Sequence, residues 1–181
     1  RLHVFTSIGA CCLPYITPST RESPIKVKSM RRVFIVGVGM TKVDRHYELG
    51  FKELIAEAAL KAIDDTKGAE IESVVVGNMM SSSLFQQDSL GALATDAIGF
   101  RGVGALKVEA ACGSGGHAVA VGYSLVASGL YDVVMVIGVE KMSDYPTSSV
   151  TKALAQAADA EYELIYGTSF VALNALLMRL Y

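Results

Sequence analysis

Short apolar runs alternate with longer amphipathic stretches from Arg31 onward, and this alternation is the strongest constraint on the fold. Runs typical of buried strands cover residues 33–38, 73–77, 106–109 and 132–138. Helical periods cover residues 49–66, 88–98 and 112–128, and Gly99 and Gly129 end the last two of them. Strands separated by helices of this length predict right-handed crossovers and a mostly parallel sheet covered by helices on both faces. The fold class is therefore α/β, and two further helices are expected over residues 151–162 and 170–180.

The first 29 residues differ from the rest of the chain. They contain Cys11, Cys12 and several prolines, without a sustained helical or strand period. We expect Met30 to be the true start and residues 1–29 to be a non-native or disordered extension. A targeting segment is the alternative interpretation, but no clean small-residue cleavage site follows its apolar stretch.

Composition excludes several classes of protein. The 181 residues are 51% hydrophobic and 19% charged, enough for a substantial core. A net charge of −2 gives no indication of a nucleic-acid or membrane-surface partner, and no apolar run approaches the roughly 18 residues that span a bilayer. Three cysteines are too few for a disulfide framework, and no spacing suggests a metal site, so a reducing, cytoplasmic setting is expected.

Cys112 is the candidate nucleophile. It follows an apolar run and precedes glycines and small residues that begin a long apolar helical period. A thiol at a strand-to-helix turn faces unpaired backbone N–H groups and the helix dipole, which favour the thiolate, and the thiolate is the nucleophilic form of cysteine. The alternative is a small buried cysteine that fills a gap between strand and helix.

A glycine motif near residue 38 is a weaker candidate for a binding site. Gly37-Val38-Gly39 resembles the start of a dinucleotide-binding loop, but Lys42 occupies the position of the third glycine and a polar run delays the helix. We therefore interpret these glycines as part of a tight strand exit.

Histidine positions supply no evident base for Cys112. His117 lies five residues along the helix, a rotation of about 140°, so the two side chains should leave different faces. No spacing links His3 or His46 to Cys112. Either a base lies elsewhere in a larger protein, or Cys112 is not catalytic.

Four segments, residues 33–42, 108–116, 129–134 and 138–143, together resemble the N-terminal half of a thiolase. The resemblance is strongest to archaeal acetyl-CoA acetyltransferases, near the sterol-carrier-protein-type thiolases. It implies a thiolase-like fold whose two similar halves pack in five layers. Residues 30–138 would then form most of the N-terminal α/β half, as βαβαβαβ without its final strand. Residues 139–181 would be the truncated start of the loop, or lid, region.

The resemblance also implies a chemistry. In that family the cysteine that matches Cys112 is acylated by an acyl-CoA thioester, and its backbone N–H helps to form an oxyanion hole. The implied reaction forms or cleaves acetoacetyl-CoA, with coenzyme A thioesters as substrates and neither a cofactor nor a metal. The family's other reacting groups lie in its C-terminal half, so this chain alone is expected to be inactive.

Partners and alternatives follow from the same resemblance. It implies a homodimer or homotetramer, and archaeal relatives also assemble with a hydroxymethylglutaryl-CoA synthase and an OB-fold protein. A degradative 3-ketoacyl-CoA or sterol-type thiolase is the alternative enzyme. A catalytically incomplete fragment that acts only as an interaction partner is the alternative from another class.

Overall fold

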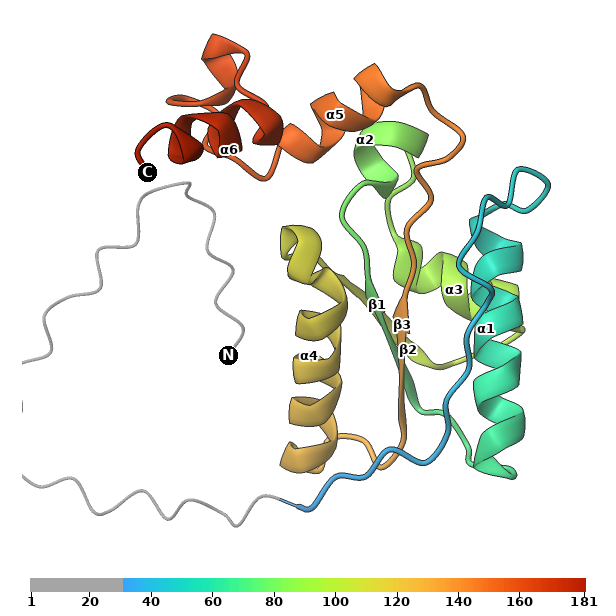
Figure 1. The fold of residues 1–181 in the computed structure, drawn as a ribbon. Coiled ribbons are helices and arrows are strands. Elements are labelled where there is room, and N and C mark those ends of the chain that lie inside the picture. Colours follow the sequence, from blue (N-terminus) through green and yellow to red (C-terminus); the bar gives the residue numbers. More distant parts are fainter. Residues whose placement is uncertain (1–30) are drawn as a thin grey trace, which may run out of the picture. The chain divides into compact units, whose positions relative to one another are not determined.

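The computed structural model describes residues 31–181, so the expectations for residues 1–29 and for a start at Met30 lie outside the described residues. Its sheet is parallel and has the strand order β2-β1-β3 (Figure 1). The strands are β1 (Ser73–Gly77), β2 (Gly104–Val108) and β3 (Val134–Gly138). The last residue of β1, Gly77, is in register with Val108 of β2 and Gly138 of β3. The predicted parallel α/β arrangement is confirmed.

Helices cover both faces of this sheet. The helices of the described residues are α1 (Phe51–Thr66), α2 (Ser81–Phe85), α3 (Leu90–Ile98), α4 (Ser114–Ser128), α5 (Thr147–Ala155) and α6 (Phe170–Met178), with 3-10 turns η1 (Ala111–Gly113) and η2 (Leu164–Tyr166). Figure 1 shows α1 and α3 on one side of the sheet and α4 on the other. A glycine in the left-handed region ends α3 and another ends α4, as expected for Gly99 and Gly129.

The two faces of the sheet are packed differently. Val74 and Val76 are fully buried and form the main core with apolar side chains of α1 and α3. On the other face α4 approaches closely, because a Cβ at Gly122 would lie 2.6 Å from a methyl carbon of Val136. The small residues of α4 therefore let its backbone lie close to the sheet and bring its N-terminus near the carboxyl end of β1.

The prediction of a buried strand over residues 33–38 is wrong for this structure. The segment is extended but pairs with no strand among the described residues, and Ile35 is 85% exposed. Its ends are held by helices instead: the Arg31 amide donates to the Ala127 carbonyl of α4 at 3.2 Å, and the Val38 amide donates to Asp65 of α1 at 3.0 Å. An apolar run joins a sheet only where the edge of a neighbouring strand lies beside it. These two hydrogen bonds attach residues 31–38 to helices and not to a strand edge.

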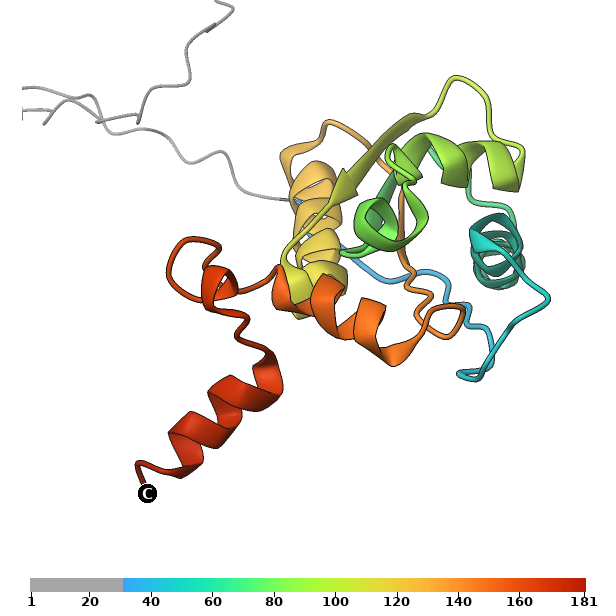
Figure 2. The ribbon, with the colours of Figure 1, turned by 90° about the horizontal axis from the view of Figure 1, so that it is seen from above.

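The region after β3 also departs from expectation. The helix predicted over residues 151–162 is wrong in its bounds, since α5 starts at Thr147, after Pro146, and ends at Ala155. The side chain of Asp159 accepts from the amides of Glu161 and Tyr162, at 2.9 Å each, and so forms a turn instead of helix. The last predicted helix is confirmed as α6, which has no buried residue and lies apart from the sheet in Figure 2.

Candidate active site

Cys112 lies in η1, between the end of β2 and the start of α4. The three strands are parallel, so their carboxyl ends meet at one edge of the sheet, where open α/β sheets place their ligand sites. The side chain of Cys112 is exposed. Next to it, Gly115 and Gly116 have open space where a Cβ would stand. The structure thus presents an accessible thiol with unobstructed surroundings at the strand-to-helix turn, as the sequence predicted.

The backbone before Cys112 is held in an uncommon conformation. Ala111 has a φ of +48°, in the left-handed region that residues other than glycine rarely adopt. The Glu109 carboxylate accepts a hydrogen bond from the Ala111 amide. The hydroxyl of Ser114, which is 5% exposed, accepts from the Ala110 amide at 3.0 Å and donates to the Ala111 carbonyl at 2.6 Å. Two side chains therefore fix the peptide groups on either side of Ala111.

The carboxyl end of strand β1 packs against the same turn. A Cβ at Gly77 would lie 2.6 Å from the Ser114 carbonyl oxygen and 3.0 Å from the Gly115 Cα, so only glycine fits there without displacing α4. The amide of Asn78 donates to the Val108 carbonyl at 3.2 Å. Gly77 and Asn78 thus contact the backbone both before and after Cys112.

A polar tie joins the ends of β1 and β3. Asn78 is 2% exposed, and its side-chain amide donates to Glu140 at 3.0 Å and to the Val139 carbonyl at 2.9 Å. Its side-chain oxygen accepts from the Ser81 amide at 3.0 Å, which starts α2. The other oxygen of Glu140 accepts from the amides of Met79 and Met80, each at 3.1 Å. Every polar atom of the Asn78 side chain is satisfied, so the tie is rigid.

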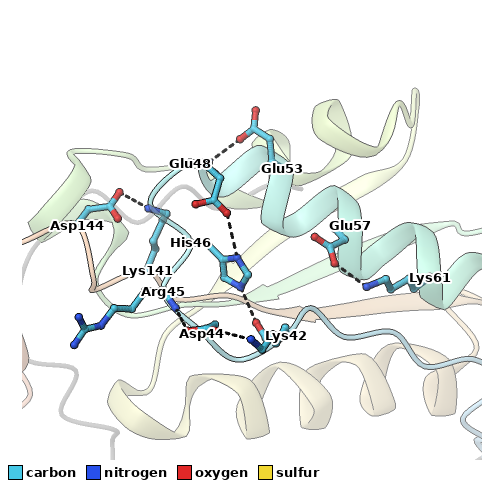
Figure 3. A network of polar contacts seen from close by, with 11 residues as sticks. Lys42, Asp44, Arg45, His46, Glu48, Glu53, Glu57, Lys61, Lys141 and Asp144 are labelled. Atoms are coloured by element: carbon cyan, nitrogen blue, oxygen red, sulfur yellow. Dashed lines mark hydrogen bonds and ion pairs between the residues drawn. The ribbon is translucent and has the colours of Figure 1, made fainter.

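Neither histidine of the described residues has Cys112 as its hydrogen-bond partner. Nδ1 of His117 lies 3.1 Å from the Gly113 carbonyl, one turn back along its own helix. His46 lies 2.7 Å from the Lys42 carbonyl, inside the loop before α1 (Figure 3). His3 lies outside the described residues. The structure thus assigns no base to Cys112 from residues 31–181.

Part of the polar network of Figure 3 belongs to that loop, while Lys61 pairs with Glu57 on α1 and Lys141 pairs with Asp144 after β3. Lys42 pairs with Asp44 at 2.6 Å, and His46 lies 3.8 Å from Glu48. The hydrogen bond from Lys42, followed by one from the Arg45 amide, holds the pKa of the Asp44 carboxyl below its ordinary value. These contacts are local, and they give the network a structural role in the entry to α1.

The glycine pair of the rejected dinucleotide motif has a packing role. A Cβ at Gly37 would lie 2.6 Å from the Ala62 carbonyl oxygen, and one at Gly39 would lie 2.2 Å from that of Ala58. Both glycines are therefore needed where the extended segment crosses α1. The interpretation as a tight strand exit is wrong in detail, because residues 31–36, the described residues before them, form no strand.

Sequence reasoning missed the residues that hold the turn. Ser114, Asn78 and Glu140 were not singled out, although Asn78 directly follows a buried valine strand. A polar residue at the carboxyl end of a parallel strand is the signal that could have identified it. In the part of the chain that the structure describes, no three His, Cys, Asp or Glu side chains gather as a metal ion requires. None of the helices described is long and apolar enough to cross a membrane.

Comparisons with known proteins agree with the fold. The family model for the thiolase N-terminal domain matches residues 33–174. An acetyl-CoA acetyltransferase of Methanothermobacter thermautotrophicus is 39% identical over 152 residues, which cover 83% of this chain and 39% of the relative. An acetyl-CoA acetyltransferase of Methanocaldococcus jannaschii is 38% identical over 154 residues, covering 84% of this chain and 39% of that protein. Human sterol carrier protein 2 is 31% identical over 127 residues, which cover 67% of this chain and 22% of that protein.

A solved structure shows the same fold. The 3-oxoacyl-[acyl-carrier-protein] synthase III of Aquifex aeolicus superposes with a TM-score of 0.50 at 24% identity, covering 55% of this chain and 32% of that one. The chain spans 39% of the length of each archaeal relative.

Proposed function

This chain belongs to the thiolase family, and we propose that it is the N-terminal portion of an acetyl-CoA C-acetyltransferase that forms or cleaves acetoacetyl-CoA through acetylated Cys112. The observation that carries the proposal is the exposed thiol at the turn between β2 and α4. The names of the archaeal relatives support the choice of acetyl-CoA as substrate.

The proposed reaction has two steps. The Cys112 thiolate attacks the thioester carbonyl of acetyl-CoA, and the tetrahedral intermediate expels the coenzyme A thiolate, which takes up the proton that Cys112 lost. A second acetyl-CoA then loses an α-proton, and its carbanion attacks the acetyl-cysteine. The carbon–carbon bond forms and the acetyl C–S bond to Cys112 breaks, which releases acetoacetyl-CoA and leaves the Cys112 thiolate; the α-proton passes to this thiolate through the group that removed it.

The geometry supports the first step. Cys112 lies two residues before α4, a helix of 15 residues, whose N-terminal dipole stabilises negative charge. We propose that the Cys112 amide donates to the oxyanion of the tetrahedral intermediate. The glycines of the first turn of α4 leave room for a thioester beside the sulfur.

The base that activates Cys112 and the group that removes the α-proton are not among the described histidines, whose ring nitrogens bond to the Lys42 and Gly113 carbonyls. We therefore propose that both groups come from a C-terminal half, and that the 181-residue chain alone transfers acetyl groups very slowly. Coenzyme A thioesters would be the only small molecules required. A cytoplasmic homodimer or homotetramer, with a hydroxymethylglutaryl-CoA synthase and an OB-fold protein as further partners, completes the proposal.

Mass spectrometry tests the nucleophile directly. The protein translated from the whole reading frame that contains these residues is incubated with acetyl-CoA, digested, and searched for acetylated cysteine. We expect an acetyl group on Cys112. In Cys112→Ser both the acetyl group and turnover should be lost, because a hydroxyl ionises far less readily than a thiol. Acetyl on another residue, or turnover by Cys112→Ser, would refute the assignment.

A longer acyl substrate is the second candidate, because sterol carrier protein 2 is also a relative. The same protein should then be tested with acetoacetyl-CoA and with a long-chain 3-ketoacyl-CoA. Faster cleavage of the long substrate would replace the acetyltransferase assignment with a degradative thiolase. If neither substrate is cleaved and Cys112 stays unmodified, an interaction role remains.

A further inference from the structure

Ser114 has a role that the proposed function does not yet use. It is the first residue of α4, two positions after Cys112, and its side chain is buried against the turn. Its hydroxyl makes two hydrogen bonds, one with the Ala110 amide and one with the Ala111 carbonyl. Both partners lie on the backbone that leads into the candidate nucleophile.

We infer that Ser114 is a positioning residue for Cys112, which it serves by holding Ala111 in the left-handed conformation. This inference rests on the proposed function of Cys112. An alanine with φ of +48° is strained, and such a residue persists only where its surroundings over-determine it. The hydroxyl of Ser114 contributes to that constraint because it bonds to the Glu109–Ala110 peptide group on one side and to the Ala111–Cys112 peptide group on the other, so it spans Ala111.

The constraint sets the direction of the thiol. Without it, Ala111 would relax toward the ordinary regions of φ and ψ, and the next residue, Cys112, would turn with it. The opposite side of the turn is fixed, since Gly77 lies against the Ser114 carbonyl and Asn78 holds Val108. Within residues 109–112 the backbone bond from the Gly113 amide to the Ala110 carbonyl, at 2.9 Å, closes the turn. The Ser114 hydroxyl and the Glu109 carboxylate are the side-chain groups that add to it at Ala110 and Ala111.

Other serines of α4 provide a matched control. Ser124 is exposed, and its hydroxyl donates to the Ala120 carbonyl at 2.8 Å within the same helix. Ser124→Ala removes a helical hydroxyl without touching the turn. At position 114, threonine and valine have the same shape and differ only in the hydroxyl, so this pair separates the hydrogen bonds from any steric effect of branching.

The experiment compares Ser114→Thr, Ser114→Val and Ser124→Ala in the protein translated from the whole reading frame. For acetylation of Cys112 by acetyl-CoA we expect Ser114→Val to lower kcat on the order of 10- to 100-fold, with KM within about twofold, because the thiol is misplaced. Ser114→Thr should restore most of the rate, and Ser124→Ala should match the unmodified protein. Equal rates for the threonine and valine variants would overturn the inference.

Two further measurements keep the outcomes distinct. If the unmodified protein shows no acetylation, the proposed function fails, and the alkylation rate of Cys112 by iodoacetamide then decides the role of Ser114 by the same comparison. If Ser114→Val does not fold, hydrogen exchange of the Ala110 amide in the unmodified protein decides it. Slow exchange supports the bond to Ser114, and exchange at the rate of an unprotected amide refutes it.

Discussion

The close approach of Gly77 to α4 yields the sharpest prediction from this structure. Gly77→Ala would place a Cβ 2.6 Å from the Ser114 carbonyl oxygen, 2.8 Å from the Ser114 carbonyl carbon and 3.0 Å from the Gly115 Cα. All three atoms are backbone, so no side chain can rotate away. An ordinary contact requires α4 to move away by roughly 1 Å at its N-terminus.

That displacement has two expected effects. Overpacking of this kind destabilises a core by about 1–3 kcal/mol, and we expect Gly77→Ala to lower the free energy of unfolding by this amount. The same movement carries Cys112, so acetylation or alkylation of its thiol should slow on the order of 100-fold. Stability is measured by urea denaturation monitored by circular dichroism, at protein concentrations where the unfolding midpoint is constant. The rate of Cys112 modification is measured on the same variants.

Gly138 is the matched control. It is the register partner of Gly77 in β3, and a Cβ there would meet nothing within 4 Å. Gly138→Ala should therefore leave stability unchanged or raise it by up to about 1 kcal/mol, because alanine lowers the entropy of the unfolded chain. Equal effects of the two substitutions on stability and on Cys112 would refute the idea that β1 positions α4.

Three further predictions concern the surroundings of the site. Glu140→Gln should cost about 1 kcal/mol in a urea titration, since an amide cannot accept at both ends from Asn78 and from the Met79 and Met80 amides; an unchanged midpoint would contradict this. The hydrogen bond from Lys52, and then its charge, hold the pKa of Asp96 below its ordinary value. The contribution of this exposed pair to stability is therefore present above the ordinary aspartate range and is lost as the pH falls through the lowered pKa. Lys52→Met should move the NMR titration midpoint of Asp96 upward with little effect on stability. Leu177 on α6 is 57% exposed, and exposed apolar side chains promote association. Leu177→Lys should therefore reduce self-association of the 181-residue chain in sedimentation velocity more than Asn174→Lys on the same helix.

Sequence patterns predicted the helices and strands that a local pattern of apolar residues marks. The valines of β1 and the apolar period of α1 fixed those elements to within two residues at either end. The same patterns could not show whether a run finds a partner, so residues 33–38 were assigned to a buried strand that the structure lacks. Helix α5 was misplaced because the Asp159 side chain competes with the helix for backbone amides.

The candidate site was predictable in place but not in its support. Cys112 stands out because glycines and small residues follow an apolar run, which is a local pattern. The tie between Asn78 and Glu140 joins residues that are 62 positions apart, and no local period marks such a pair. The left-handed backbone at Ala111 was also unforeseen, since alanine has no preference for that conformation and only the contacts of its neighbours impose it.

The attachment of Arg31 to the end of α4 bears on how this protein is made. Its side chain pairs with Asp132, 101 residues later in the chain. A ribosome adds about 5–20 residues each second, so the segment from Arg31 to Val38 waits roughly 5–20 s for the partner that fixes its first residue. During that time Phe34, Ile35 and Val36 emerge as an uncharged run of high strand propensity, the kind of sequence that associates with other nascent chains. Because these three side chains stay exposed after Arg31 is attached, the same run remains open to association with other chains in the folded molecule as well.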